Sequence, residues 1–182
     1  MPVKMLLLIA LFAALTAVGG FIRIPIPPVP ITLQTLFVYL AAHLLGTKGG
    51  VASQILFLMV GLLGVPIFTM GGGPGYILKP SFGYLVGFPI GALVIGLMVG
   101  KSNGSLNWWR LFMANGVGML VILFIGVLYL YINMNFILQT EITWIYALWI
   151  GVGVFLPGEI VKIWIAVNLV RKLKFHIQFL QR

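Results

Sequence analysis

Long apolar runs alternate with short polar or Gly- and Pro-rich segments along most of the chain. The first run lies between Lys4 and Arg23, and no A-x-A cleavage site precedes Arg23, so we interpret it as a helix and not as a signal peptide. A helix of roughly 20 apolar residues can cross a bilayer. The pattern predicts six such helices, the second and third rather short, at about residues 5–22, 32–45, 51–67, 82–99, 108–133 and 144–170.

The connections between these runs differ in character. Residues 23–31 hold four prolines, which fix φ and remove backbone donors, so we expect an extended segment there. "GTKGG" at 46–50 is predicted to be a turn. "TMGGGPGYILKPS" at 69–81 has too many Gly and Pro residues for regular structure, and we expect an irregular loop.

Composition agrees with a membrane protein. Hydrophobic residues make up 62% of the 182 residues and charged residues 7%, whereas soluble domains carry roughly a quarter charged residues. The mean hydropathy is +1.17. We therefore predict an all-α integral membrane protein, with residues 1–182 forming a single transmembrane domain of six helices in one compact bundle.

The distribution of basic residues predicts the orientation. An even number of crossings puts both termini on one side, which would hold eight of the 11 Lys and Arg residues: Lys4, Lys48, Lys101, Arg110, Arg171, Lys172, Lys174 and Arg182. Loops rich in Lys and Arg stay in the cytoplasm, so the N- and C-termini are expected to be cytoplasmic. The net charge of +9 is scattered singly, which argues against nucleic acid as a partner.

Common catalytic and nucleotide-binding motifs are missing from the sequence. "VGKS" at 99–102 is not a Walker motif, because Ile95 stands where the pattern needs Gly. The chain has no Cys and no Asp, and its two His residues are far apart, so we expect neither a metal site nor a Ser–His–Asp triad. Any active transport must therefore draw on a partner or an ion gradient.

"FLPGEIVK" at 155–162 places two ionisable side chains inside an apolar run. Glu159 and Lys162 lie on one helical face at spacing i, i+3, and such groups at bilayer depth are costly and usually functional. Pro157–Gly158 is expected to weaken the helix beside a cavity. One interpretation is a structural salt bridge. The other is a polar patch in a pocket, where Glu accepts from and Lys donates to a neutral ligand with paired N–H and C=O groups.

Other polar residues are candidates for the same cavity. Asn115, Gln34, Tyr39, Ser53 and Gln54 lie in predicted helices, where each is also suited to a helix–helix hydrogen bond.

The loops at 23–31 and 69–81, which this orientation places on the outer side, offer further candidates. The "GGGPG" glycines, among them Gly73 and Gly75, allow close approach of backbone to a ligand. Lys79 and Arg23 are candidates for an anionic group at the pocket mouth, or simply anchors at the membrane interface.

The first predicted helix carries Ala10-x-x-x-Ala14 and Ala13-x-x-x-Ala17. Small residues at this spacing let another helix approach closely, which indicates a docking face.

Taken together, "VPITLQTL" (29–36), "GVPIFTMGGGPGYILKPSFGYLVGF" (64–88) and "FLPGEIVK" (155–162) resemble the BioY family, the biotin-specific S components of energy-coupling-factor (ECF) transporters. The resemblance covers most of the chain. It implies a six-helix protein of the bacterial cell membrane that binds biotin near the outer face. Ala10 and Ala14 match the motif that docks onto a transmembrane coupling protein with two ATPase subunits. By this resemblance the chain needs no cofactor of its own, and only its partners use ATP.

Biotin fits the chemistry of the polar pair. Glu159 is expected to accept from a ureido N–H, and Lys162 to donate to the ureido oxygen or the carboxylate, with Asn115 as a helper. Aromatic side chains such as Tyr84 would supply apolar walls. Two positions depart from the family pattern: Glu159 stands where Asp is usual, and Lys79-Pro80-Ser81 replaces "GPT".

Two further functions remain as alternatives. A stand-alone ion-coupled carrier would use Glu159, although no internal repeat of the kind found in carriers is evident. A membrane enzyme with Glu159 as general acid or base would lack a nucleophile, a metal and a second carboxylate within reach.

Overall fold

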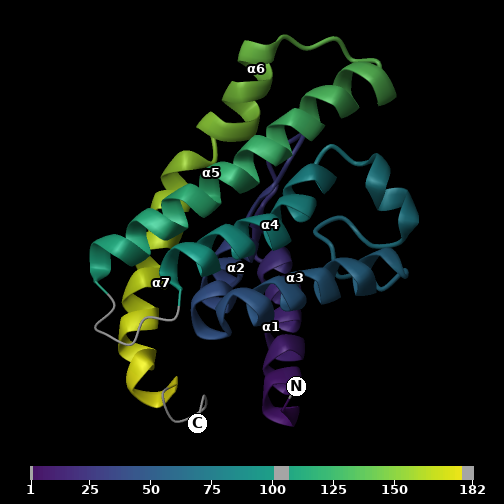
Figure 1. The fold of residues 1–182 in the computed structure, drawn as a ribbon. Coiled ribbons are helices and arrows are strands. Elements are labelled where there is room, and N and C mark those ends of the chain that lie inside the picture. The colour runs from purple at the N-terminus through teal and green to yellow at the C-terminus, as the bar shows by residue number, and fades with distance from the viewer. Residues whose placement is uncertain (1, 101–106, 178–182) are drawn as a thin grey trace.

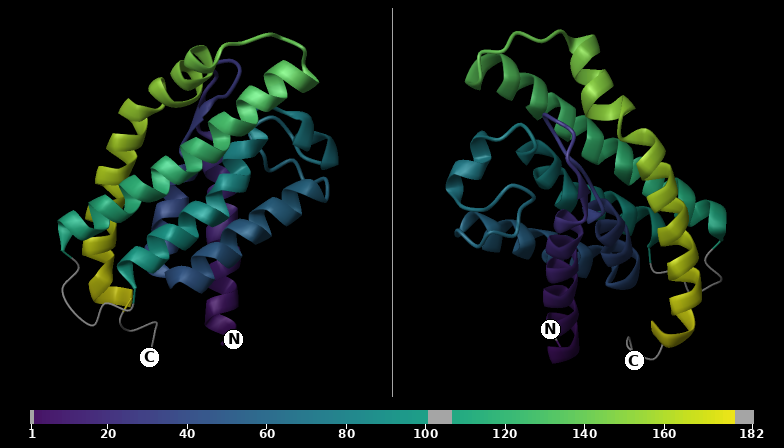
Figure 2. Two further views of the ribbon diagram at one scale, coloured as in Figure 1. Left: turned by 45° about the horizontal axis from the view of Figure 1, so that its top comes forward. Right: turned by 180° about the vertical axis from the view of Figure 1, so that it is seen from behind.

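The computed structural model describes residues 2–100 and 107–177, with side chains up to residue 173. These parts form a compact bundle of six helical rods (Figures 1 and 2). The start of α1 (Val3–Phe21) and the last turns of α7 (Leu156–Ile177) lie at the same end of the bundle (Figure 1). This placement is what an even number of membrane crossings requires.

Within the described residues, four helical stretches are long and apolar enough to cross a bilayer: Val3–Phe21, Phe82–Val99, Trp108–Ile137 and Trp144–Leu173. The first two are α1 and α4. The third joins α5 (Trp108–Ile132) to a π-helical extension, η2 (Asn133–Ile137). The remaining rods, α2 (Gln34–Leu44) and α3 (Gly46–Leu62), are shorter, as their apolar runs predicted. The protein is thus a helical membrane bundle.

The turn predicted at 46–50 is wrong. Only Leu45 separates α2 from α3, and Gly46, with φ of 70°, makes the change of direction. Gly50 lies inside α3, where an added Cβ would come within 2.8 Å of the Ala42 Cα. The glycines here allow two helices to pack closely, a use that composition does not distinguish from a turn.

The predicted helix over 144–170 is interrupted. It consists of α6 (Trp144–Leu148), a π-helical turn η3 (Trp149–Gly153), and α7. Pro157 lies in the first turn of α7, where its missing N–H has no helical partner to lose. Pro157–Gly158 therefore starts a helix, and does not weaken the middle of one as expected. This start fixes Glu159 and Lys162 in the first two turns of α7.

Both loops that were expected to face outward contain some regular structure. The proline-rich segment is closed by two short strands, β1 (Arg23–Ile24) and β2 (Ile31–Thr32), which pair antiparallel with Arg23 opposite Thr32. We call residues 23–32 the ribbon. Residues 64–81, which we call the covering loop, include a 3₁₀ turn η1 (Pro74–Leu78), so the expectation of a wholly irregular loop is wrong.

Small residues let the helices around the site approach closely. On α4, Gly87 packs against Ile122 of α5, whose Cα would lie 3.0 Å from an added Cβ. Gly126 of α5 packs in turn against the ring of Tyr84 on α4. Helix α2 packs against both α4 and α7, which places its polar face opposite the start of α7.

Candidate functional site

A cavity lies between α2, α4, α5, α7, the ribbon and the covering loop. Its polar lining consists of Thr32, Gln34, Thr35, Tyr39, Thr69, Tyr76, Ser81, Tyr84, Glu159 and Lys162. Its apolar lining consists of Val29, Pro30, Leu85, Phe88, Met119, Ile122, Leu123 and Phe155. A mainly apolar and aromatic wall with a few convergent polar groups is typical of a small-molecule site.

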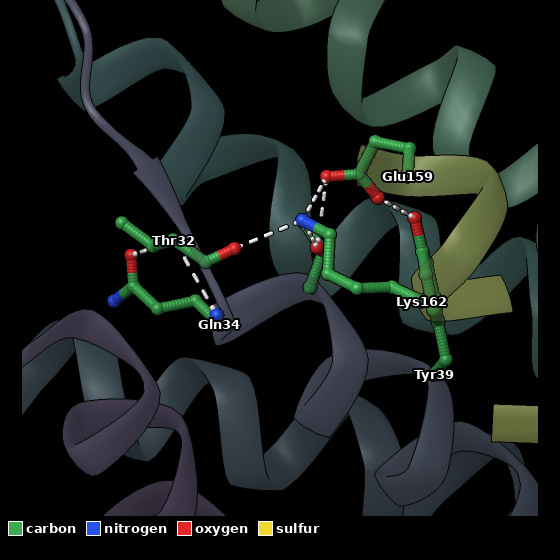
Figure 3. A network of polar contacts seen from close by, with 6 residues as sticks. Thr32, Gln34, Tyr39, Glu159 and Lys162 are labelled. Atoms are coloured by element: carbon green, nitrogen blue, oxygen red, sulfur yellow. Dashed lines mark hydrogen bonds and ion pairs between the residues drawn. The ribbon is translucent and has the colours of Figure 1, made fainter. Parts of the chain in front are cut away.

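Glu159 and Lys162 form an ion pair at the centre of this lining (Figure 3). The two residues are 2% and 4% exposed, so both charges are removed from solvent. A buried pair of this kind is tolerated only when further hydrogen bonds satisfy both groups. Helix α2 supplies most of those bonds.

Lys162 uses its whole donor capacity. Its Nζ donates to the Thr32 carbonyl at 2.9 Å, to Thr35 Oγ1 at 2.7 Å and to Glu159 Oε1. An ammonium has three N–H groups. A ligand acceptor can therefore reach this ammonium only by replacing one of these three partners.

Glu159 keeps one acceptor position free. Oε1 accepts from Thr35 Oγ1 at 2.9 Å and from Lys162, and Oε2 accepts from the Tyr39 hydroxyl at 2.6 Å. A carboxylate offers about four lone-pair directions, so the described residues leave a single one without a partner, on Oε2. The site in this form can take a ligand N–H at Glu159 without breaking any bond.

A second polar group lies where the ribbon meets α2. Gln34 is 2% exposed, and its Oε1 faces the hydroxyls of Thr32 at 3.2 Å and Thr69 at 3.4 Å. Its Nε2 has no hydrogen-bond partner among the described residues, and a Cβ added at Gly20 of α1 would lie 3.0 Å from it. This donor therefore faces α1, which contributes nothing to the cavity lining.

Aromatic rings close one side of the cavity. Tyr84 stacks on Phe155 with centroids 5.6 Å apart and planes at 26°. The Tyr84 hydroxyl points away into the wide turn before α7 and donates to the Gly151 carbonyl at 2.8 Å. Tyr84 therefore offers the cavity a ring face, while its polar end fixes η3.

The structure brings together Glu159, Lys162, Gln34, Tyr39 and Tyr84, all of which line the cavity. Asn115 does not line it, and its Oδ1 contacts His43 Nε2 at 2.8 Å.

Three predicted residues of the covering loop also lie outside the lining. Lys79 and Gly75 are exposed. Gly73 is buried but holds the loop, donating to the Gly61 carbonyl at 2.7 Å with φ of 93°. The loop reaches the cavity through Thr69, Tyr76 and Ser81 instead.

Ser53 and Gln54 form the helix–helix contact that was the alternative to a ligand role. Gln54 Nε2 donates to Thr16 Oγ1 on α1 at 3.2 Å and to Ser53 Oγ at 3.1 Å. All three side chains are fully buried between α1 and α3.

Thr35 is the residue that sequence reasoning missed at the centre of the site. Its hydroxyl donates to Glu159 and accepts from Lys162. It precedes Tyr39 by one helical turn, so both lie on one face of α2. The sequence shows this spacing, but it does not show that this face of α2 contacts Glu159 and Lys162 of α7.

The four alanines of the small-residue stripe on α1 differ in exposure. Ala13 and Ala17 are buried, whereas Ala10 and Ala14 are exposed. With Leu56, Phe57, Val60 and Ile67 these alanines line an apolar groove.

Within the described residues, no group of three or more His, Cys, Asp or Glu side chains could hold a metal ion.

Comparison with known proteins gives consistent matches. A sequence model of the BioY family matches residues 1–179. A probable biotin transporter BioY of Lysinibacillus sphaericus is 46% identical over 80% of this chain and 74% of its own length. Its counterpart in Pyrococcus horikoshii is 37% identical over 96% of this chain and 98% of its own.

Structural similarity points the same way. The crystal structure of the S component for biotin from an ECF-type ABC transporter superimposes with a TM-score of 0.83. It is 32% identical to this chain, with 94% of this chain and 91% of that one covered. From the family match, the relatives and this likeness, we conclude that the chain belongs to the BioY family.

Proposed function

We propose that this chain is the high-affinity biotin-binding subunit of an ECF-type vitamin uptake transporter. The observation that carries the proposal is the buried Glu159–Lys162 pair with one free carboxylate acceptor, set in a cavity with aromatic walls. The relatives bear the name of biotin transporters, and the similar solved structure is an S component for biotin. The chain is a transporter subunit and not an enzyme.

The ureido ring of biotin offers two N–H donors beside one C=O acceptor. In our proposal one N–H fills the free position on Glu159 Oε2. The ureido oxygen takes the Lys162 N–H that now points to the Thr32 carbonyl. Tyr84 and Phe155 contact the apolar ring system, and Gln34 lines the cavity where the ribbon meets α2.

Asn115 is not a ligand contact in this proposal, because its Oδ1 already contacts His43 Nε2 and its side chain does not line the cavity. Lys79, Gly73 and Gly75 belong to the frame of the covering loop in this proposal and do not contact the ligand. A site that pairs several polar groups at once discriminates strongly against analogues that lack them.

Delivery inward requires partners in this proposal. The single transmembrane domain of residues 1–182 resides in the bacterial cell membrane with both termini in the cytoplasm. A transmembrane coupling protein docks on the exposed Ala10 and Ala14 of α1, and its two ATPase subunits supply the energy. Exposure of both alanines beside an apolar groove supports this assignment.

The ion-coupled carrier is less well supported. Such a carrier would need Glu159 to exchange its proton or ion during transport, but its carboxylate is already engaged in hydrogen bonds from Lys162, Thr35 and Tyr39.

Isothermal calorimetry on the purified protein in detergent tests the proposal. We expect tight one-to-one binding of biotin and much weaker binding of an analogue whose ureido group is replaced by a diamine. Absence of biotin binding by well-folded protein would refute the proposed function. Equal binding of both ligands would refute the assignment of the pair to the ureido ring.

A further inference from the structure

The ribbon and the covering loop form adjoining parts of the cavity wall. The ribbon contributes Val29 and Pro30, and the covering loop contributes Thr69 and Tyr76. The two segments are far apart in sequence and attached to different helices. A ligand that enters or leaves the cavity between these two segments must separate the ribbon from the covering loop.

One side chain joins these two segments directly. The Arg23 guanidinium, at the start of β1, donates to the Thr69 carbonyl. Among the described residues, this is the single hydrogen bond that runs from the ribbon to the covering loop. Arg23 is exposed and does not line the cavity.

Buried residues of α2 and α7 hold the ribbon at Thr32 and the covering loop at Thr69. The Thr32 carbonyl accepts from Lys162 at 2.9 Å, and Thr32 lies opposite Arg23 in the ribbon. The hydroxyls of Thr32 and Thr69 both contact Gln34 Oε1. The Arg23–Thr69 contact, on the exposed side, is therefore the part of this junction that can open without disturbing the buried pair.

From this arrangement we infer that Arg23 is a clasp between the ribbon and the covering loop, and that it sets the rate at which the ligand enters and leaves. Arg23 is a positioning residue here and does not touch the ligand. The inference rests on the proposed function, since the ligand concerned is biotin. The clasp holds together two segments that a ligand must pass between in either direction, so its loss should speed entry and exit together.

Arg23→Met and Arg23→Lys test this inference. Methionine removes every donor but keeps a long side chain, whereas lysine keeps one donor for the carbonyl. Because a hydrogen bond from a charged group is lost, we expect Arg23→Met to raise the association and dissociation rates of tritiated biotin by about tenfold each. The dissociation constant should stay within a factor of about three, and Arg23→Lys should behave like the wild type.

Two controls separate the clasp from a direct ligand contact. Lys79→Met removes an exposed cation of the covering loop and should leave both rates unchanged. The amide of biotin lacks the carboxylate, so Arg23→Met should accelerate its exchange as much as that of biotin.

A third variant keeps the inference testable if Arg23→Met folds poorly. The chain has no Cys, so Arg23→Cys with Thr69→Cys can be joined by a short bis-methanethiosulfonate cross-linker, which attaches to each thiol through a reducible disulfide. We expect the cross-link to trap bound biotin and its reduction to restore exchange.

Three results would overturn the inference. The first is a dissociation rate within twofold of the wild type in Arg23→Met. The second is weaker binding of biotin but not of its amide, which would make Arg23 a carboxylate contact. The third is free exchange in the cross-linked protein. In each case the wild type still binds biotin, so the proposed function stands; failure of wild-type binding would instead refute that function.

Discussion

At the scale of single residues, the site is a buried charge pair in which Glu159 and Lys162 neutralise each other. Glu159 and Lys162 satisfy each other with help from Thr35, Tyr39 and the Thr32 carbonyl. The salt bridge and the ligand pocket, which the sequence left as alternatives, are therefore not exclusive. The same pair neutralises itself and lines a cavity with an acceptor to spare.

The first prediction concerns the stability of that pair. Glu159→Gln leaves a buried ammonium without its counter-charge, and Lys162→Met does the same to the carboxylate. Breaking a buried pair costs about 3–5 kcal/mol, whereas replacing both partners is often neutral. The double variant should therefore unfold at a higher temperature than either single variant in thermal scans in detergent. Additive losses of stability would show that the two charges do not interact.

The second prediction concerns Thr35. Thr35→Val keeps the shape but removes the hydroxyl that joins both charges, so biotin affinity should fall by about tenfold. Thr35→Ser should restore most of it. Thr140→Val changes an exposed threonine and serves as the control. Equal affinity of Thr35→Val and wild type would contradict a positioning role.

Much of this site could be predicted from the sequence because ionisable residues in an apolar run are rare and informative. Glu159 and Lys162 stand out for that reason, and Tyr39 and Gln34 are polar residues in a helix. Asn115 carries the same signal but contacts His43 instead. Spacing along one helix does not say which neighbouring helix a polar side chain faces.

At the scale of the elements, glycine decides how close the helices come. The sequence indicated the helices well where apolar runs were long, as in α4, whose bounds Phe82–Val99 match the expected 82–99. It misjudged Gly49 and Gly50 as a turn and missed the wide turn before α7. Close packing and π-helical turns arise from contacts between elements, which a local pattern does not contain.

The third prediction uses two glycines of the same helix. An added Cβ at Gly126 would come within 2.2 Å of the Tyr84 ring, whereas at Gly116 nothing lies within 4 Å. Gly126→Ala should therefore displace a cavity wall, destabilise the protein by about 1–3 kcal/mol and weaken biotin binding.

Gly116→Ala is the matched control for that change. It should be neutral or slightly stabilising, because alanine favours a helix. Thermal unfolding and calorimetry of both variants check the prediction. Equal behaviour of the two would mean that the α4–α5 contact is looser than the structure shows.

At the scale of the whole molecule, the proposed function assigns ligand capture and partner docking to separate surfaces. The cavity lies among α2, α4, α5 and α7, whereas the exposed alanines lie on α1. The start of α1 and the end of α7 lie at the same end of the bundle (Figure 1). A division of this kind predicts that docking can be disrupted while biotin binding survives.

The fourth prediction tests this division. Ala14→Trp should leave biotin affinity of the isolated protein unchanged but abolish co-purification with a coupling protein and its ATPases, and with it ATP-dependent uptake. Leu120→Trp enlarges another exposed side chain, on α5, and should affect neither property. Normal uptake by Ala14→Trp would place the docking face elsewhere.

The central claim is that the buried pair binds biotin, and calorimetry of Glu159→Gln and Lys162→Met tests it most directly. The exposed residues Glu141 and Lys172 provide matched controls as Glu141→Gln and Lys172→Met. Because truncating one partner of a buried charge pair is costly, we predict that biotin affinity falls by about a hundredfold or more in both site variants. The controls should bind as the wild type does. Folded site variants that bind biotin with undiminished affinity would contradict the account and leave the pair a purely structural salt bridge.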